Sequence, residues 1–489
     1  MRRIVILGLA ALVLGAAGWS ALWLSGRGEI AARIGLERDR LAAEGIEIAH
    51  GAPAIGGFPF GYEVSLPDVV LRLPVEGLRA DLAQITASAG LGAADRIVYR
   101  LPGRFTVQSE GEAPGLVEIE ADGLVIEQTL ESGRPARLGL RAASVLAVHA
   151  AEGQALNAAV EFAGIEASLE PPQAAVGETA LKLSVDSIDY LVTGESDAGA
   201  ATRLEGGIAR LGLTATTDQR MPASVLAVLA GAPGGGRLAL TVQAGETRMA
   251  GGVEAAGGGT TTLAIGAVGG VMTIEDGRIA LSGSTEHNRL EIVPTDADAA
   301  LRGGAVIDRI ETVYRSPLVP AERMDELALR VALGKITPDN AFWTAVDPAG
   351  VLSRTPGEII LDLVGTARML ADEATGAPRE AELGTLSVRT VDVAMLGAQA
   401  ELTGDLEFLQ PANQPVGRLV LTLTRAMEVL GDLARAGILD LATVQIISDT
   451  AANYTRAGEA PQTLVSEFAF DGGEVTLNGN RLMMFGGRR

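Results

Sequence analysis

The sequence contains no cysteine, and aromatic residues make up only 3% of its 489 positions. Without cysteine the chain has no disulfide, no thiolate nucleophile, no cysteine-ligated zinc or iron–sulfur cluster, and no N-terminal cysteine for lipid attachment. Lysine is also scarce, because Lys182 and Lys335 are the only two. Abundant Ala and Gly beside this arginine bias indicate the codon usage of a GC-rich bacterial genome. A core with so few aromatic residues must pack through Leu, Val, Ile and Ala.

Basic residues are too few to favour a nucleic-acid partner. Lys and Arg number 39 against 61 Asp and Glu, which gives a formal net charge of −22. A surface that neutralises nucleic-acid phosphates needs the opposite balance, so nucleic acid is excluded as a partner class. Hydrophobic residues make up 47% of the chain and charged residues 20%, a composition typical of folded rather than disordered proteins.

The N-terminus carries a long apolar run. Residues 4–24 contain no charged side chain, and a helix of that length spans the roughly 30 Å hydrocarbon layer of a bilayer. Arg2 and Arg3 precede the run, and Trp19 and Trp23 lie near its far end, where indole rings favour the membrane interface. The pattern predicts one transmembrane helix, with these four residues at the membrane interfaces.

Two questions concern how this segment is used. A cleaved signal peptide would be cut after the small residues Ala16, Ala17 and Gly18, but the apolar run continues beyond them, which favours an uncleaved signal-anchor. The far flank holds more arginines than the near flank, although long domains translocate largely regardless of such charges. The short basic head and the acidic, cysteine-free body favour a single-pass protein of the bacterial inner membrane with its body in the periplasm.

Downstream, the sequence divides by pattern. Apolar residues alternate with polar ones, as in Leu327, Leu329, Val331 and Leu333, which is the period of half-buried antiparallel strands. We expect five segments: a membrane anchor over 1–26, a stalk helix over 27–45, a first β-rich half over 46–230, a glycine-rich junction over 231–259 and a second β-rich half over 260–489.

Turn residues predict hairpin connections. Residues 276–283 (DGRIALSG) resemble residues 472–479 (GGEVTLNG), and residues 206–211 (GGIARL) are a looser copy. Asp-Gly and Gly-Gly supply the positive φ of a tight hairpin. Helical spacing occurs in three stretches, at residues 221–230, 338–352 and 424–441. We therefore predict a mainly β (α+β) fold: an extended, curved antiparallel sheet of hairpin-connected strands with a few packed helices and one N-terminal transmembrane helix.

No motif specifies a metal or nucleotide site. His50, His149 and His287 lie far apart, each without a second histidine at i+4, which argues against zinc. A calcium loop that would start at Asp296 has alanine and leucine where a further ligand and the turn glycine belong. Gly334-Lys335 is followed by isoleucine where a phosphate loop needs Ser or Thr. We predict no cofactor and no metal.

Catalytic motifs are equally unconvincing. Residues 194–198 (GESDA) miss the final glycine of a nucleophile elbow. Pairs of carboxylates could serve a glycosidase, but among 61 acids such pairs arise by chance. Solvated surface charge is therefore the better interpretation, and a carboxylate-dependent hydrolase stays as the weakest of the functional hypotheses.

The most distinctive local segment is residues 56–64 (GGFPFGYEV). Phe58, Phe60 and Tyr62 fall on one face of an extended segment, and Pro59 cannot donate a ladder hydrogen bond, which places it at an edge or at a strand start. One interpretation is an aromatic plug that closes an end of the sheet. The other is a docking surface, or a surface through which lipid enters.

Several segments together resemble a known family. They are the basic start with its apolar anchor, the stalk that ends near Gly45, GGFPFGYEVSL at 56–66, RLPGRFTVQ at 100–108, LARAGILD at 433–440 and FDGGEVTLNG at 470–479. This set resembles an uncharacterised proteobacterial family, domain-of-unknown-function family 2125, over nearly the whole chain. The departure is Gly61, where a basic residue is expected.

More distantly, the chain is similar to the AsmA-like envelope proteins. That resemblance implies an inner-membrane anchor and a long periplasmic β-sheet, and some of these proteins are thought to carry phospholipid along an apolar groove. It implies no catalytic residue.

Three hypotheses follow for function. The leading one is a non-enzymatic, membrane-anchored envelope protein whose apolar sheet face holds or conducts lipid chains. The second keeps the fold but closes the core, so that the acidic surface docks on an envelope protein partner. The third is the hydrolase. Alternation along the strands does not separate a filled core from an open apolar face.

Overall fold

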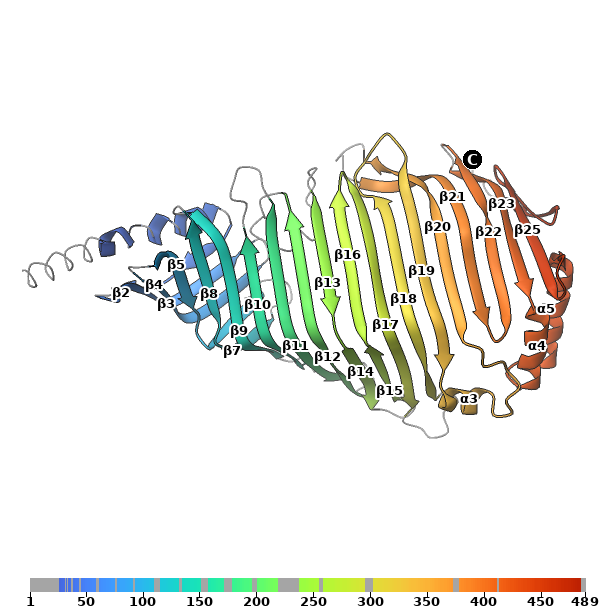
Figure 1. The fold of residues 1–489 in the computed structure, drawn as a ribbon, viewed down its shortest axis with the longest axis horizontal. Helices are drawn as coiled ribbons and strands as arrows, with labels where there is room; N and C mark the ends of the chain where they lie inside the picture. The colour runs from blue at the N-terminus through green and yellow to red at the C-terminus, as the bar shows by residue number, and fades with distance from the viewer. Residues whose placement is uncertain are drawn as a thin grey trace, which may run out of the picture. The chain divides into compact units, whose positions relative to one another are not determined.

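Antiparallel strands make up most of the chain in the computed structural model (Figure 1). The predicted mainly β fold with antiparallel pairing is therefore confirmed. The structure describes residues 26–484 except 31, 33, 37, 44, 59–60, 75–76, 91–92, 110–114, 132–133, 151–156, 171–177, 196–199, 219–236, 255–257, 295–301, 373–377 and 411–412.

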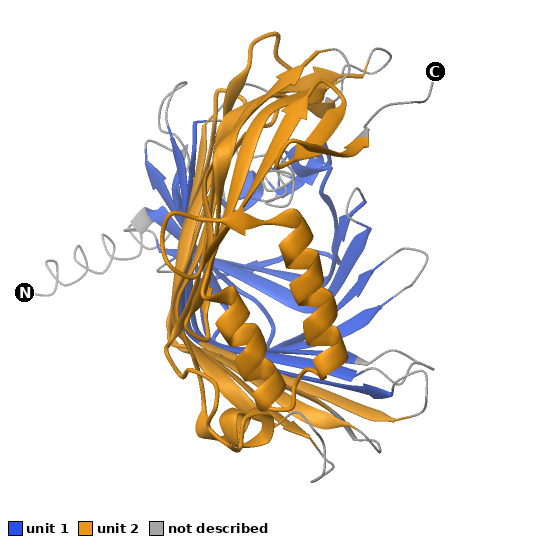
Figure 2. Cartoon of the chain, turned by 90° about the vertical axis from the view of Figure 1, so that its right-hand side faces the viewer, with its two compact units in different colours: residues 1–195, 209–232 blue, residues 196–208, 233–489 orange. Residues whose placement is uncertain are grey.

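The chain divides into two compact units, coloured separately in Figure 2. Unit 1 comprises residues 1–195 and 209–232, and unit 2 comprises residues 196–208 and 233–489. Strand β12 (Ala201–Thr217) contributes residues to both units. Within the glycine-rich stretch 231–259, the described residues include two strands, β13 (Leu238–Ala244) and β14 (Thr247–Glu254).

Unit 1 is built from long strands with shorter strands between them. β4 pairs with both β5 and β6, and β9 pairs with both β7 and β8, so each pair of short strands lies end to end along a long one. The strands are β1 (Glu47–Ala49), β2 (Ala54–Gly56), β3 (Gly61–Leu73), β4 (Leu78–Gly90), β5 (Ala93–Arg100), β6 (Arg104–Ser109), β7 (Leu116–Asp122), β8 (Val125–Glu131), β9 (Arg134–Ala150), β10 (Asn157–Glu170) and β11 (Thr179–Glu195).

Unit 2 continues the hairpin-connected pattern. From β17 to β23 each strand pairs with the next one in sequence, and β23 then pairs with β25. Its remaining strands are β15 (Gly259–Ile265), β16 (Ala267–Glu275), β17 (Arg278–Pro294), β18 (Gly303–Pro317), β19 (Asp325–Pro338), β20 (Gly357–Ala371), β21 (Pro378–Met395), β22 (Ala398–Leu409), β23 (Gln414–Thr424), β24 (Arg456–Ala457), β25 (Thr463–Asp471), β26 (Glu474–Leu477) and β27 (Asn480–Met484).

Two of the three predicted hairpin turns are present. Asp276 and Gly277 join β16 to β17, and both have positive φ, at 51° and 72°. Gly472 and Gly473 join β25 to β26 in the same way. The third prediction was wrong, because residues 206–207 lie inside β12, paired with β14. A Gly-Gly pair can form a turn, but here the pairing of the flanking residues with β14 keeps it in an extended strand.

Helices are few, as predicted, but one was split. The predicted helix over 338–352 is α3 (Asn340–Val346). The predicted helix over 424–441 ends early: α4 (Ala426–Arg435) stops at Gly437, whose φ is 77°. A second helix, α5 (Leu441–Tyr454), begins after the N-cap Asp440, whose carboxylate accepts the Thr443 N–H at 2.7 Å. Gly437 ends α4 because its backbone adopts the left-handed conformation. The predicted helix 221–230 lies outside the described residues.

The N-terminal predictions are only partly covered. Residues 26–30, 34–36 and 38–43 are helical, and Gly45 has positive φ just after them. Residues 4–24, with Arg2, Arg3, Trp19 and Trp23, lie outside the described residues. Among the residues that the structure does describe, none of the helices has the length and apolarity needed to cross a membrane.

Candidate functional site: an apolar sheet face in each unit

The strands of unit 2 align their apolar residues into a continuous row. Residues directly opposite each other in an antiparallel ladder have side chains on the same face. Such partners connect seven successive residues on β13 and β16 to β21: Leu240, Met272, Leu281, Tyr314, Leu329, Leu363 and Val388. At about 4.8 Å between strands, the row extends for about 29 Å along the sheet.

Further rows lie on the same face, each two residues along β19 and β20 from the one before. One contains Val331, Leu361, Val391, Leu402 and Leu421. The next contains Ile310, Leu333, Ile359, Val393, Ala400, Leu423 and Leu464. We call the side of the sheet that carries these three rows the apolar face of unit 2.

The opposite side of the same strands is polar. Arg330 on β19 and Asp362 on β20 are cross-strand partners and form an ion pair at 3.0 Å. Arg315 reaches Glu326 at 2.8 Å, and Arg418 reaches Glu467 at 3.2 Å. The two sides therefore differ sharply, because the same strands present aliphatic side chains on one face and ion pairs on the other.

The apolar face of unit 2 is not a closed core. Leu281 is 38% exposed and Tyr314 is 37% exposed, and most of their neighbours in the three rows are only half-buried. Among the residues named in the three rows, only Val388 is buried. A filled β-sandwich would bury such residues nearly completely between two sheets. The alternating pattern in the sequence fits either a closed core or an open face. In the structure, the apolar side of these strands is a partly exposed surface.

Unit 1 repeats the arrangement. One row contains Val69, Leu82, Phe105, Ile119, Ala147, Val160 and Tyr190. A second contains Val64, Ala87, Tyr99, Ile126, Leu140, Ala167 and Leu183. Val69 and Leu82 are almost completely buried, whereas Leu138 on β9 is 39% exposed. On the other face, Arg104 and Glu120 are cross-strand partners and form an ion pair at 2.6 Å.

The distinctive aromatic segment is only partly described. Tyr62 on β3 lies opposite Ala89 and belongs to the apolar side of unit 1. Its hydroxyl occupies the space that a side chain at Gly26 would need, so it packs against the helical segment that precedes β1. Phe58 lies in the turn before β3 and is 51% exposed. Pro59 and Phe60 lie outside the described residues, so a shared aromatic surface at this point stays a prediction.

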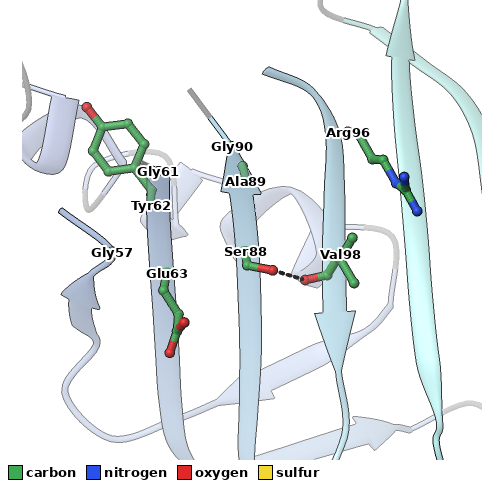
Figure 3. Close-up of a pocket in the computed structure, with 9 residues that line it drawn as sticks. All are labelled: Gly57, Gly61, Tyr62, Glu63, Ser88, Ala89, Gly90, Arg96 and Val98. Atoms are coloured by element: carbon green, nitrogen blue, oxygen red, sulfur yellow. Dashed lines mark hydrogen bonds between the residues drawn. The ribbon is translucent and has the colours of Figure 1, made fainter. Parts of the chain in front are cut away.

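A shallow cavity of 370 Å³ adjoins Tyr62 on strands β3 to β5 (Figure 3). The Tyr62 ring points away from Glu63, which lies on the opposite face of β3. Two of the polar groups around the cavity already have partners: the Ser88 hydroxyl donates to the Val98 carbonyl at 3.4 Å, and Arg96 pairs with Glu127 at 2.6 Å. The cavity therefore offers few polar groups free to hold a ligand.

The described carboxyl groups whose pKa is displaced have structural partners. In the described part of the chain no group of three potential metal ligands comes together. Five described carboxyl groups have a displaced pKa, and all five are displaced downward. For Asp440 the main cause is the hydrogen bond from the Thr443 backbone, and for Glu474 it is the Arg481 side chain. A general acid at neutral pH needs the opposite displacement.

The model of the family "Uncharacterized protein conserved in bacteria (DUF2125)" matches residues 23–269, about half of the chain. The chain belongs to that family. No curated protein and no solved structure is detectably similar to it.

Proposed function

We propose that this member of the DUF2125 family holds or conducts the acyl chains of lipids on its apolar sheet faces. In this proposal the protein is not an enzyme, its apolar segment 4–24 anchors it in the bacterial inner membrane, and an extended, curved sheet stands in the periplasm. The observation that carries the proposal is the apolar face of unit 2, where aligned aliphatic rows stay partly exposed.

The physical reason is the cost of exposed apolar surface. Soluble proteins rarely expose contiguous apolar patches of more than a few hundred Å², and larger ones mark sites for lipid, ligands or partners. A row about 29 Å long is comparable with the roughly 30 Å hydrocarbon layer of a bilayer. An acyl chain lying on such rows exchanges bilayer contacts for contacts with Leu, Val and Ile, and leaves no polar group unsatisfied.

Photo-crosslinking in the full-length chain tests this proposal. A photoreactive amino acid at Leu281 would lie on the apolar face, and the same residue at the neighbouring Ser282 would lie on the polar face. Both positions are exposed. After irradiation in cells and purification, mass spectrometry should find covalent phospholipid on the Leu281 variant and little on the Ser282 variant. Equal adducts at both positions, or none at Leu281 in folded protein, would contradict the proposal.

A matched pair of charge substitutions sharpens the test. Tyr314→Asp places a carboxylate on the apolar face beside Leu281, whereas Val271→Asp places one on the opposite face of β16. The two positions are similarly exposed, at 37% and 42%. A carboxylate among acyl chains is strongly unfavourable. The lipid adduct at Leu281 should fall at least several-fold with Tyr314→Asp and stay unchanged with Val271→Asp.

A further inference from the structure

An open cavity of 520 Å³ lies where α4 begins, beside the end of the apolar face of unit 2. Its volume is within the range of small-ligand sites. Its walls combine apolar groups from Met427, Pro461 and Leu464 with the charged side chains of Arg425, Glu428 and Glu459. Apolar and charged side chains of unit 2 therefore line the same cavity.

The apolar wall joins the cavity to the sheet. Leu464 lies opposite Leu423, which in turn lies opposite Ala400, in the third apolar row described above. A molecule with its polar end in the cavity would have its apolar part next to that row. The cavity could therefore hold the polar end of an amphipathic ligand whose apolar part lies on the adjacent row.

The charged wall is ordered by hydrogen bonds. The Arg425 Nε donates to the Glu428 carboxylate at 2.8 Å, and the Gln462 side-chain amide donates to its other oxygen. The Arg425 backbone N–H donates to the Gln462 carbonyl at 2.9 Å, although both residues have φ near +60°. These contacts hold the guanidinium and the carboxylate at the cavity, close to the Glu459 loop.

The Arg425–Glu428 pair is open to exchange. The two side chains are 54% and 42% exposed, and ion pairs this exposed contribute little to stability. A ligand phosphate could take over the guanidinium as a charge-assisted partner. The carboxylates of Glu428 and Glu459 would then accept hydrogen bonds from a cationic group of the same ligand.

We propose that this cavity binds the headgroup of a phospholipid that carries a phosphate and a primary ammonium, with Arg425 on the phosphate and Glu428 with Glu459 on the ammonium. This assignment rests on the proposed function, which it makes more specific. An anionic headgroup without an amine would leave two carboxylates beside its phosphate with no cation to balance them. A quaternary ammonium offers no N–H for those carboxylates.

The test uses the full-length chain in vesicles with equal amounts of phosphatidylethanolamine and phosphatidylglycerol. A photoreactive amino acid at Met427, which is 40% exposed, should give adducts enriched in phosphatidylethanolamine. Arg425→Gln should reduce the yield of phosphatidylethanolamine adducts about tenfold, the size expected when a charged hydrogen bond to the phosphate is lost. Arg435→Gln is the matched control, because Arg435 forms an exposed ion pair with Asp432 on the same helix away from the cavity.

Titration with soluble glycerophosphoethanolamine separates headgroup from acyl binding. If Arg425→Gln weakens this binding and Arg435→Gln does not, the headgroup site is supported. That holds even if Leu281 gives no lipid adduct. In that case the proposed lipid function would fail, and the cavity would be a site for a soluble phosphodiester. Equal adducts of both lipids at Met427, or no effect of Arg425→Gln on either measurement, would overturn the headgroup site. Lipid adducts at Leu281 would in that case still support the apolar face.

Discussion

Leu281 on β17 and Tyr314 on β18 lie directly opposite each other, and both side chains remain more than one-third exposed. In a packed sheet such a pair would be covered by a second layer. Here the pair lies in the middle of a row of apolar residues that runs from β13 to β21. Val388 belongs to the same row but is buried. Because buried and exposed apolar residues lie on the same face, stability and the proposed lipid binding can be tested at different positions.

The buried part of the apolar face should dominate stability. Leu82 is 3% exposed opposite Val69, whereas Leu138 is 39% exposed. Leu82→Ala should lower the free energy of unfolding of unit 1 by about 2–5 kcal/mol, because it removes apolar contacts and leaves a cavity. Leu138→Ala should lower it by less than about 1 kcal/mol. Urea denaturation followed by circular dichroism measures both, and equal losses would contradict the assignment of Leu82 to a core.

Partly buried ion pairs on the polar face should contribute more to the free energy of unfolding than exposed ones. The Glu382 side chain is 11% exposed and accepts hydrogen bonds from Arg368 at 2.9 and 3.1 Å. Glu382→Gln should destabilise the protein by about 1–3 kcal/mol, because it removes a charged acceptor from a partly buried guanidinium. Glu326→Gln, in the exposed pair with Arg315, should stay within about 0.5 kcal/mol. The same denaturation experiment decides, and a larger loss for Glu326→Gln would count against this ranking.

Asp347 should make stability depend on pH in the acid range. Its carboxylate has no exposed surface and accepts the backbone N–H groups of Val351 at 2.9 Å and Leu352 at 2.8 Å. Burial acts to raise its pKa, but the backbone hydrogen bonds and the charge of Arg354 outweigh burial, so the pKa lies below its usual value. A lowered folded-state pKa adds stability that is present above the unfolded-state pKa of about 4 and is lost as the pH falls through the folded-state pKa.

The measurement is the melting temperature of the wild type and of Asp347→Asn as the pH is lowered below about 4. The wild type should lose more stability on acidification than the variant, which has no carboxylate to protonate at this position. Parallel curves for the two proteins would show that Asp347 is not a source of the acid sensitivity.

Location is tested by reporters at the C-terminus. A fusion after Arg489 to an enzyme that is active only outside the cytoplasm should be active, because a periplasmic body carries its C-terminus with it. The control is a reporter active only in the cytoplasm at the same site, which should be silent. The reverse pattern would invert the proposed orientation.

Local pattern was enough for much of the architecture. Alternation along single strands and the Asp276-Gly277 and Gly472-Gly473 turns predicted an antiparallel, hairpin-connected β fold, because side-chain period and turn geometry are properties of neighbouring residues. The same reasoning predicted the helix around α3. It missed the break at Gly437, since helical spacing continues through a glycine whose backbone happens to be left-handed.

Register and burial were decided by the tertiary structure. Arg330 meets Asp362, and Arg425 meets Gln462, only because strands and helices distant in sequence come together. Nothing in the sequence distinguishes Asp347 from a surface acid. In the fold it is buried and accepts hydrogen bonds from the Val351 and Leu352 backbone. Alternation specifies that each strand has an apolar side, but whether that side is covered depends on what packs against it, which is set by contacts between strands and not by any one of them. The sequence by itself thus determined the elements and their two-sidedness, and the tertiary structure decided that the aliphatic rows align and stay partly open.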